Sequence, residues 1–106
     1  MGGSKSLAAL RIDEIASLRL TDSIDIEAEY DEKIWCLTTT QLNAVGCGYT
    51  LTKALENLEE SVLGAYELYV KELKKSELSE KAMELRRNLR LYISKNSYEI
   101  ARKQKA

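Results

Sequence analysis

The spacing of the apolar residues changes near residue 50, from every second position to every third or fourth. Before this point, Ile24, Ile26 and Ala28 alternate with carboxylates, which is typical of a half-buried strand. After it, an apolar stripe runs at helical spacing from Leu55 to Leu73. Strands followed by helices predict an α+β fold in which an antiparallel meander of three or four strands packs on a long helix.

The second and third strands are predicted to form a hairpin. A two-residue loop at 31–32 places Ala28 opposite Trp35 and Ile26 opposite Leu37, so that the apolar residues share one face. Slipping the pairing by one residue would set the apolar residues of one strand among the carboxylates of the other. The alternation therefore favours this register.

The other strands carry weaker signals. Residues 16–20 alternate and are predicted as the first strand, joined to the next by a turn at 21–23. Residues 7–15 fit a helix or a strand. The glycine-rich "NAVGCGY" suits an edge strand that ends at Gly48. The sheet is thus expected over about residues 16–49.

Two helices are predicted after the sheet. Thr50 is placed to cap the first, over about 51–74, and Ser76 or Ser79 to cap the second, over about 77–95. One kinked helix is the open alternative, since no glycine or proline separates the two. The second apolar stripe, out of phase with the first, consists of Leu78, Ala82, Leu85, Leu89 and Tyr92. The basic tail after residue 95 loses this stripe and is expected to fray.

Length and composition favour one domain spanning residues 1–106. The 106 residues are 44% hydrophobic and 31% charged, which is ordinary for a globular protein and unlike a disordered one. The start, "MGGSKSLAAL", has no sustained apolar region typical of a signal peptide, and no apolar run is long enough to span a membrane. We therefore expect a cytoplasmic protein without membrane contact.

The chain has no histidine, which excludes histidine-based acid–base catalysis and the common zinc sites. Its cysteines, Cys36 and Cys47, are interpreted as small half-buried thiols in a reducing compartment, with a disulfide as the alternative. No cofactor is predicted. An enzyme is the weakest interpretation, because its only candidate metal ligands are acidic pairs in turns. These are Asp13, Glu14, Asp31 and Glu32.

Charge is distributed unevenly along the chain. Residues 1–50 carry eight acidic and four basic side chains, whereas residues 76–106 carry four acidic and eight basic ones. A basic tail can contact nucleic acid, although on a helix it is more often a solvated face. We expect at most weak, sequence-independent binding of RNA or DNA, confined to the tail. The candidate residues for this alternative are Arg86, Arg87, Arg90, Arg102 and Lys103, with Tyr92 or Tyr98 as a stacking platform.

The junction "GYTLTKALENLEES" resembles the antitoxin family called HicB, in which a glycine and a threonine lead from a meander into a helix. The matching residues are Gly48, Thr50, Leu51, Ala54, Leu55 and Leu58, and the hairpin "YDEKIWCLTTTQL" has the family's shape. The resemblance covers about residues 24–72. The chain is divergent, because it lacks the family's proline-rich connection, and Tyr49 and Lys53 replace acidic residues.

Many such antitoxins also carry a module that binds operator DNA. Residues 76–106 lack both the strand of a ribbon-helix-helix and the tight glycine turn of a helix-turn-helix, so no such module is predicted.

The resemblance implies a non-enzymatic protein that binds and masks a small, basic, RNA-cleaving toxin. Asp25, Glu27 and Glu29 project from one face of a predicted strand and are the candidate partner-binding residues. A solvated sheet face is the simpler interpretation of the same pattern.

An oligomeric scaffold is a further alternative. The candidate contact residues of a homodimer are Leu78, Leu85, Leu89 and Tyr92, because their 3.5-residue spacing would leave an apolar stripe exposed on an isolated helix.

Overall fold

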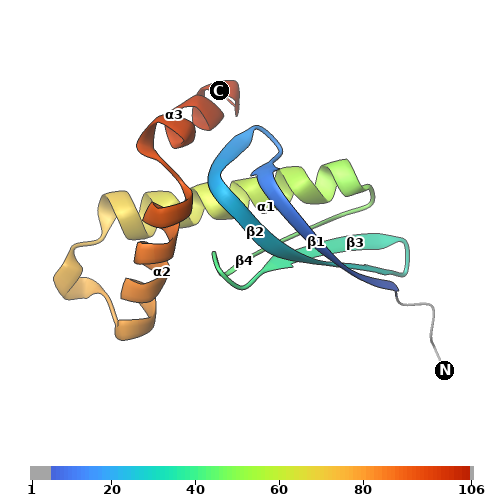
Figure 1. Ribbon diagram of the computed structural model, residues 1–106, viewed down its shortest axis with the longest axis horizontal. Coiled ribbons are helices and arrows are strands. Elements are labelled where there is room, and N and C mark those ends of the chain that lie inside the picture. The colour runs from blue at the N-terminus through green and yellow to red at the C-terminus, as the bar shows by residue number, and fades with distance from the viewer. Residues whose placement is uncertain (1–5, 106) are drawn as a thin grey trace.

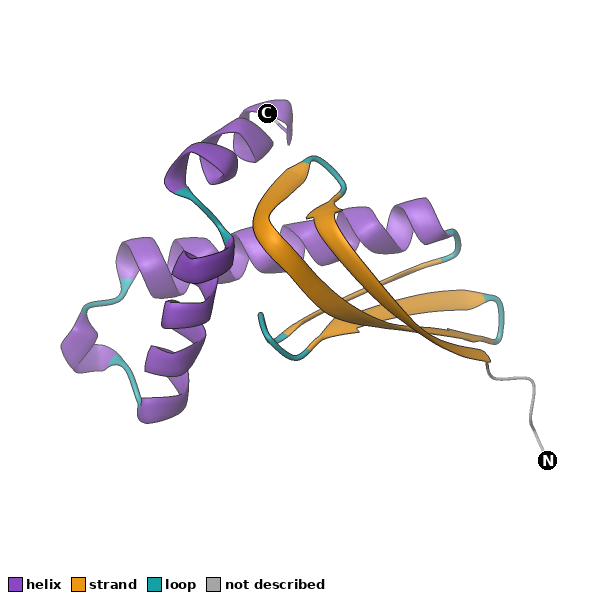
Figure 2. Ribbon diagram, viewed as in Figure 1, coloured by secondary structure: helices purple, strands orange, loops and turns teal. Residues whose placement is uncertain are grey.

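The computed structural model describes residues 6–105 as a four-stranded antiparallel sheet followed by helices (Figure 1). The strands pair in chain order, and the main helix lies against one side of the sheet (Figure 2). This confirms the predicted α+β meander. The start "MGGS" lies outside the described residues. In chain order the elements are β1 (Ser6–Ile15), β2 (Leu18–Asp31), β3 (Ile34–Thr39), β4 (Ala44–Gly48), α1 (Leu51–Tyr66), η1 (Glu67–Glu72), η2 (Lys75–Glu77), α2 (Glu80–Tyr92) and α3 (Lys95–Lys105).

The β2–β3 hairpin has the predicted two-residue loop, but at 32–33 instead of 31–32. Both loop residues have positive φ, 51° and 66°, as a type I′ turn requires. Ala28 therefore faces Leu37, and Tyr30 faces Trp35 with ring centroids 4.9 Å apart. The expected pairing of Ala28 with Trp35 is wrong by one two-residue step. Such a step leaves every side chain on its predicted face, so alternation alone does not detect it.

The first strands differ more from expectation. Residues 6–15 form β1, and the predicted turn at 21–23 lies inside β2. The register shifts where this polar segment faces β1, and the Asp22 side chain accepts a hydrogen bond from the backbone N–H of Ser23. The turn-forming residues thus interrupt the regular β1–β2 pairing instead of reversing the chain. The reversal occurs two residues before β2, at Ala16, which has a φ of 55°.

Helix α1 packs directly on β4 because two glycines remove the side chains between them. A Cβ at Gly46 would overlap the backbone nitrogen of Leu58 and lie 2.6 Å from the carbonyl oxygen of Ala54. Thr50 caps the helix as predicted, its hydroxyl accepting a hydrogen bond from the Lys53 N–H at 3.0 Å. The glycine–threonine junction therefore sets both the start of α1 and its distance from the sheet.

The core lies between the sheet and the helices. Of the seven residues whose spacing predicts a common core, five are buried and two, Trp35 and Leu55, are partly buried against them. The five buried ones are Ile24, Ile26, Leu37, Leu58 and Val62. Alternating positions of β2 and successive turns of α1 thus supply the centre of the fold.

The C-terminal part contains separate helices. Helix α1 continues into the π-helical segment η1, and a break then precedes α2, which Ser79 caps through the Ala82 N–H. Helices α1 and α2 are therefore separate, as predicted, and do not form one kinked helix. The predicted fraying after residue 95 is wrong, because α3 forms there and buries Tyr98 and Ala101. Its partners are distant in sequence, so the local pattern does not reveal them.

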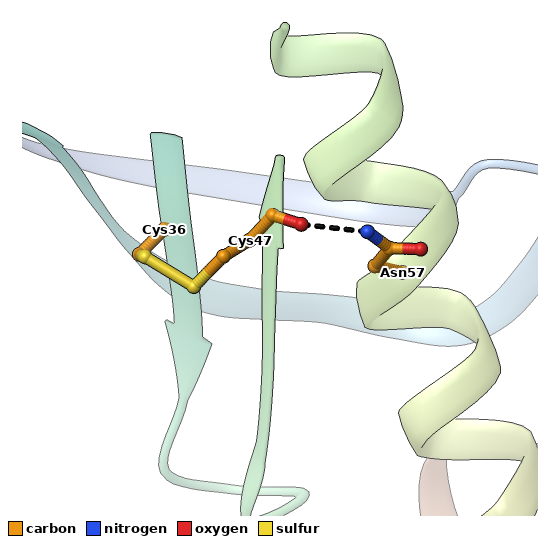
Figure 3. Close-up of a disulfide and its surroundings, with 3 residues drawn as sticks. All are labelled: Cys36, Cys47 and Asn57. Atoms are coloured by element: carbon orange, nitrogen blue, oxygen red, sulfur yellow. Dashed lines mark hydrogen bonds between the residues drawn. A yellow bond between two sulfur atoms is a disulfide. The ribbon is translucent and has the colours of Figure 1, made fainter. Parts of the chain in front are cut away.

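Cys36 and Cys47 lie opposite each other in β3 and β4 and form a disulfide (Figure 3). The interpretation of two thiols is wrong for this structure, and the alternative holds. Strand register, not spacing in the sequence, brings their Cα atoms to 4.1 Å. Beside the disulfide, the Asn57 amide of α1 donates a 2.6 Å hydrogen bond to the Cys47 carbonyl and ties β4 to the helix. Within residues 6–105, no helix has the length and apolar character needed to cross a membrane.

Candidate functional site

One face of the sheet, called the outer face here, points away from α1. The three predicted partner-binding carboxylates occupy alternate positions of β2 on this face. The outer face carries Leu7, Ala9, Arg11, Asp25, Glu27, Glu29, Cys36, Thr38, Val45 and Cys47. Strand pairing therefore brings the predicted acidic residues together with side chains from all four strands.

The outer face is both acidic and apolar. Asp25 forms a 2.8 Å ion pair with Arg11, and both side chains are largely exposed. Glu27 belongs to a row across the sheet in which Ala9 and Thr38 flank it, with Val45 beyond. Val45 is 53% exposed, and Leu7, at another position of the face, is 66% exposed. Exposed aliphatic side chains beside carboxylates are suited to a protein partner with basic and apolar contacts.

The predicted dimer residues of the second stripe are not exposed together on one surface. Leu85 and Leu89 are buried within the fold, and Leu78 and Tyr92 are half-buried. The Tyr92 hydroxyl accepts a 2.9 Å hydrogen bond from the Gln41 side chain. Because the stripe folds back onto its own chain, it leaves no exposed apolar seam on α2. The homodimer stays a prediction, without this reason for it.

The predicted nucleic-acid residues separate into two groups. Arg86, Arg87 and Arg90 line one open pocket of about 390 Å³ on α2. Arg102, on α3, is instead bound to carboxylates of α1 and η1, and Lys103 is exposed elsewhere on α3. Tyr98 is buried and stacked on Tyr66, so it offers no free ring for a base. The basic residues of the sequence thus do not form one surface.

Helix α3 is held by a cluster of charged and aromatic side chains. The Glu67 carboxylate accepts hydrogen bonds from the Tyr98 hydroxyl and from Nε of Arg102. The guanidinium of Arg102 also reaches Glu60 at 3.0 Å. Hydrogen bonding from Arg102, and secondarily from Tyr98, lowers the pKa of Glu67, while burial and the bond to Glu67 raise the pKa of Tyr98. These groups are occupied by one another, so we interpret the cluster as structural.

A second cluster joins α3 to the β1–β2 turn through Glu59. This carboxylate is 2% exposed and accepts hydrogen bonds from the Ser17 N–H at 3.0 Å and from the Ser17 hydroxyl. Its other oxygen lies 3.0 Å from Nζ of Lys105, and this contact raises the pKa of Lys105. Glu59 was not predicted as a structural or functional residue from the sequence. The signal was its position four residues after Leu55 and three before Val62, on the apolar face of α1.

The four acidic residues considered as metal ligands are divided between the two ends of β2. Asp13 and Glu14 lie near the β1–β2 turn, and Asp31 and Glu32 lie at the β2–β3 turn. In the described part of the chain, no group of three or more metal-binding side chains converges.

Comparisons with models of protein families, with curated proteins and with solved structures find no match to this chain. The resemblance to HicB antitoxins therefore stays a prediction based on the junction and the hairpin.

Proposed function

We propose that this chain is a non-enzymatic, cofactor-free protein-binding domain similar to HicB-type antitoxins, and that it masks a small basic RNA-cleaving toxin in the cytoplasm. The observation that carries the proposal is the outer face of the sheet. Its carboxylates stand in a row on β2, and exposed Leu7 and Val45 lie on the same face. A basic RNA-binding surface would be attracted to the carboxylates and would bury the aliphatic side chains.

The two kinds of side chain have different roles in this proposal. Glu27, which is exposed, steers a basic partner toward the sheet and affects mainly the rate of association. Asp25 contributes less, because Arg11 already neutralises part of its charge. Leu7 and Val45 supply the apolar contact area, which affects mainly the rate of dissociation.

Co-expression with a small basic protein encoded by the adjacent open reading frame tests the proposal. Where that protein alone arrests growth, co-expression should restore growth, and the purified complex should associate more slowly as salt rises. Glu27→Lys should slow association. Glu99→Lys, which reverses an exposed charge on α3, is the matched control and should not. Unrelieved toxicity, or equal association of both variants, would contradict the proposal.

The cytoplasmic location is tested by the cysteines. Cytoplasmic proteins seldom keep a disulfide, so the Cys36–Cys47 bond is the feature that argues against this location. Rapid thiol alkylation of intact cells, followed by mass spectrometry, should find both cysteines alkylated. A disulfide in nearly all molecules would contradict a cytoplasmic location and leave the binding face unaffected.

An oligomeric scaffold is the second candidate, and β1 is the observation that favours it. This strand forms one edge of the sheet, and Leu7 and Leu10 are exposed on its two faces. Among residues 6–105, no strand pairs with the backbone N–H and C=O groups on the free edge of β1, so β1 of a second copy could pair with it antiparallel. We therefore propose a homodimer through β1 instead of α2.

Sedimentation distinguishes this dimer from a monomer. Leu10→Lys should dissociate it, whereas Leu91→Lys, at an exposed position of α2, should not. A monomer at high micromolar concentration would remove the scaffold candidate.

A further inference from the structure

Three arginines and a methionine lie along one side of α2. Met83 lies three and four residues before Arg86 and Arg87, and Arg90 lies four and three residues after them, so the four side chains share one helical face. Lys75, from the short 3₁₀ segment η2 before α2, completes the group. Together they line an open pocket of about 390 Å³, which we call the arginine pocket. This volume is within the range of sites for small ligands.

The charges of the arginine pocket are not neutralised by the protein. Among residues 6–105, none of its four cations lies within ion-pair distance of a carboxylate, and the lining contains no acidic side chain. Nε of Arg86 is also excluded from solvent and has no hydrogen-bond acceptor in the described part of the chain. A buried donor without an acceptor is unfavourable, so the fold does not fully stabilise Arg86 in this position. The binding capacity of the pocket lies in its four cations, which have no carboxylate partner in the described chain.

The chemistry of the lining selects the ligand. Guanidinium groups bind phosphate oxygens through paired hydrogen bonds. A ligand with a single carboxylate would neutralise only one of the four positive charges, so a ligand with several negative charges fits the pocket better. Arg86 and Arg90 are one helical turn apart, roughly 6 Å along the axis, so they can contact different phosphates of one ligand. We propose that the arginine pocket binds consecutive phosphate groups, as found in a polyphosphate chain or in a nucleic-acid backbone.

The basic tail does not provide the same site. The carboxylates of α1 and η1 already occupy Arg102 and Lys105, whereas the arginines of α2 have no such partners in the described chain. Of the basic residues that the sequence suggested for nucleic acid, phosphate recognition is thus assigned to Arg86, Arg87 and Arg90 of α2 and not to Arg102 and Lys103 of α3. It is independent of the proposed toxin-binding face, because none of the pocket residues belongs to the sheet.

Two ligands test the proposal with the whole chain. Calorimetry measures binding of tripolyphosphate, and fluorescence anisotropy measures binding of a short labelled single-stranded RNA. Arg86→Gln and Arg90→Gln should each weaken binding about tenfold or more, because each removes a charge-assisted hydrogen bond. The salt dependence of RNA binding should fall by about one unit of slope for each arginine removed. Lys103→Gln, at an exposed cation of α3, is the matched control and should bind as the parent does.

The two arms also separate the two sources of phosphate. Tight binding of tripolyphosphate without RNA binding identifies a small oligophosphate as ligand, and the reverse identifies a nucleic-acid backbone. The proposal is overturned when neither ligand binds at millimolar concentration, or when Lys103→Gln weakens binding as much as the arginine variants. The melting temperatures of all variants are measured alongside. If only Arg86→Gln loses binding and its melting temperature is also lowered, the loss reflects misfolding and counts against the pocket. The exposed Arg90→Gln should lose binding as well.

Discussion

Helices α2 and α3 are both rich in basic residues, yet the structure uses their charges in opposite ways. On α3, Arg102 and Lys105 are bound to Glu59, Glu60 and Glu67 of the preceding helical segments. On α2, the arginines line a pocket without any carboxylate. Basic residues therefore stabilise the fold in α3 and are left available for a ligand in α2. Net charge along the sequence does not distinguish the two cases.

The largest expected effect comes from removing the aromatic anchor of α3. Tyr98 is buried and stacks on Tyr66 with ring centroids 4.6 Å apart. Tyr98→Ala should therefore lower the free energy of unfolding by about 3 to 5 kcal/mol, measured by urea denaturation. Tyr49→Ala is the control, because that side chain is 78% exposed and should change stability by less than about 0.5 kcal/mol. Equal effects of the two variants would show that α3 is not docked.

The next effect is that of the buried carboxylate. Glu59→Ala removes the acceptor of the Ser17 N–H and the nearer of the two carboxylates that pair with Lys105, and should cost about 2 kcal/mol. Its neighbour Glu60 is more than half exposed, so Glu60→Ala should cost less than about 1 kcal/mol. A larger loss for Glu60→Ala than for Glu59→Ala would contradict the greater contribution expected of the buried carboxylate.

A smaller effect depends on pH. Since the pKa of Glu67 is lowered in the folded chain, its contribution to stability is present above its ordinary pKa of 4.5 and is lost as the pH falls through the lower folded value. The stability difference between the parent and Glu67→Gln should therefore be constant near neutral pH and shrink below about pH 4.5. Denaturation of both proteins across this range measures it. A difference that grows toward acid would have the wrong sign.

The smallest effect is expected on α2, and it sharpens the contrast with α3. Arg87 and Arg90 are exposed and have no ion pair within residues 6–105, so Arg87→Gln and Arg90→Gln should change stability by less than about 0.5 kcal/mol. Arg102→Gln should be clearly more destabilising, because it removes the bonds to Glu60 and Glu67. Thermal denaturation of the three variants measures the difference. Similar losses for all three variants would remove the distinction between the helices.

Side-chain periodicity predicted the fold class well. Alternation placed Ile24 and Ile26 on the inner face of β2, and helical spacing placed Leu58 and Val62 against them, as the structure confirms. Periodicity reports only which face a residue occupies. The hairpin register therefore escaped it, because a two-residue shift at Trp35 preserves every face.

The remaining errors concern contacts between distant residues. The end of the chain was expected to fray because its own pattern is weak, whereas Arg102 fixes α3 to carboxylates 35 and 42 positions earlier. The disulfide follows from the register of β3 with β4, which the sequence does not specify. The three carboxylates of β2 share one face, as the alternation indicated, but their role in partner binding stays a prediction. The arginines of α2 were named from the sequence together with Arg102, and the pocket that they line was not predicted.

The positions of Glu59 and Glu60 on α1 have a consequence for the order of folding. Glu59 binds Ser17, 42 residues before it, and Glu60 binds Arg102, 42 residues after it. The hairpins and the α1–β4 contact close short loops, whereas each of these two bonds closes a long one at a greater entropic cost. We therefore expect both bonds to form late in folding, after the hairpins and the α1–β4 contact, although they involve adjacent residues of one helix.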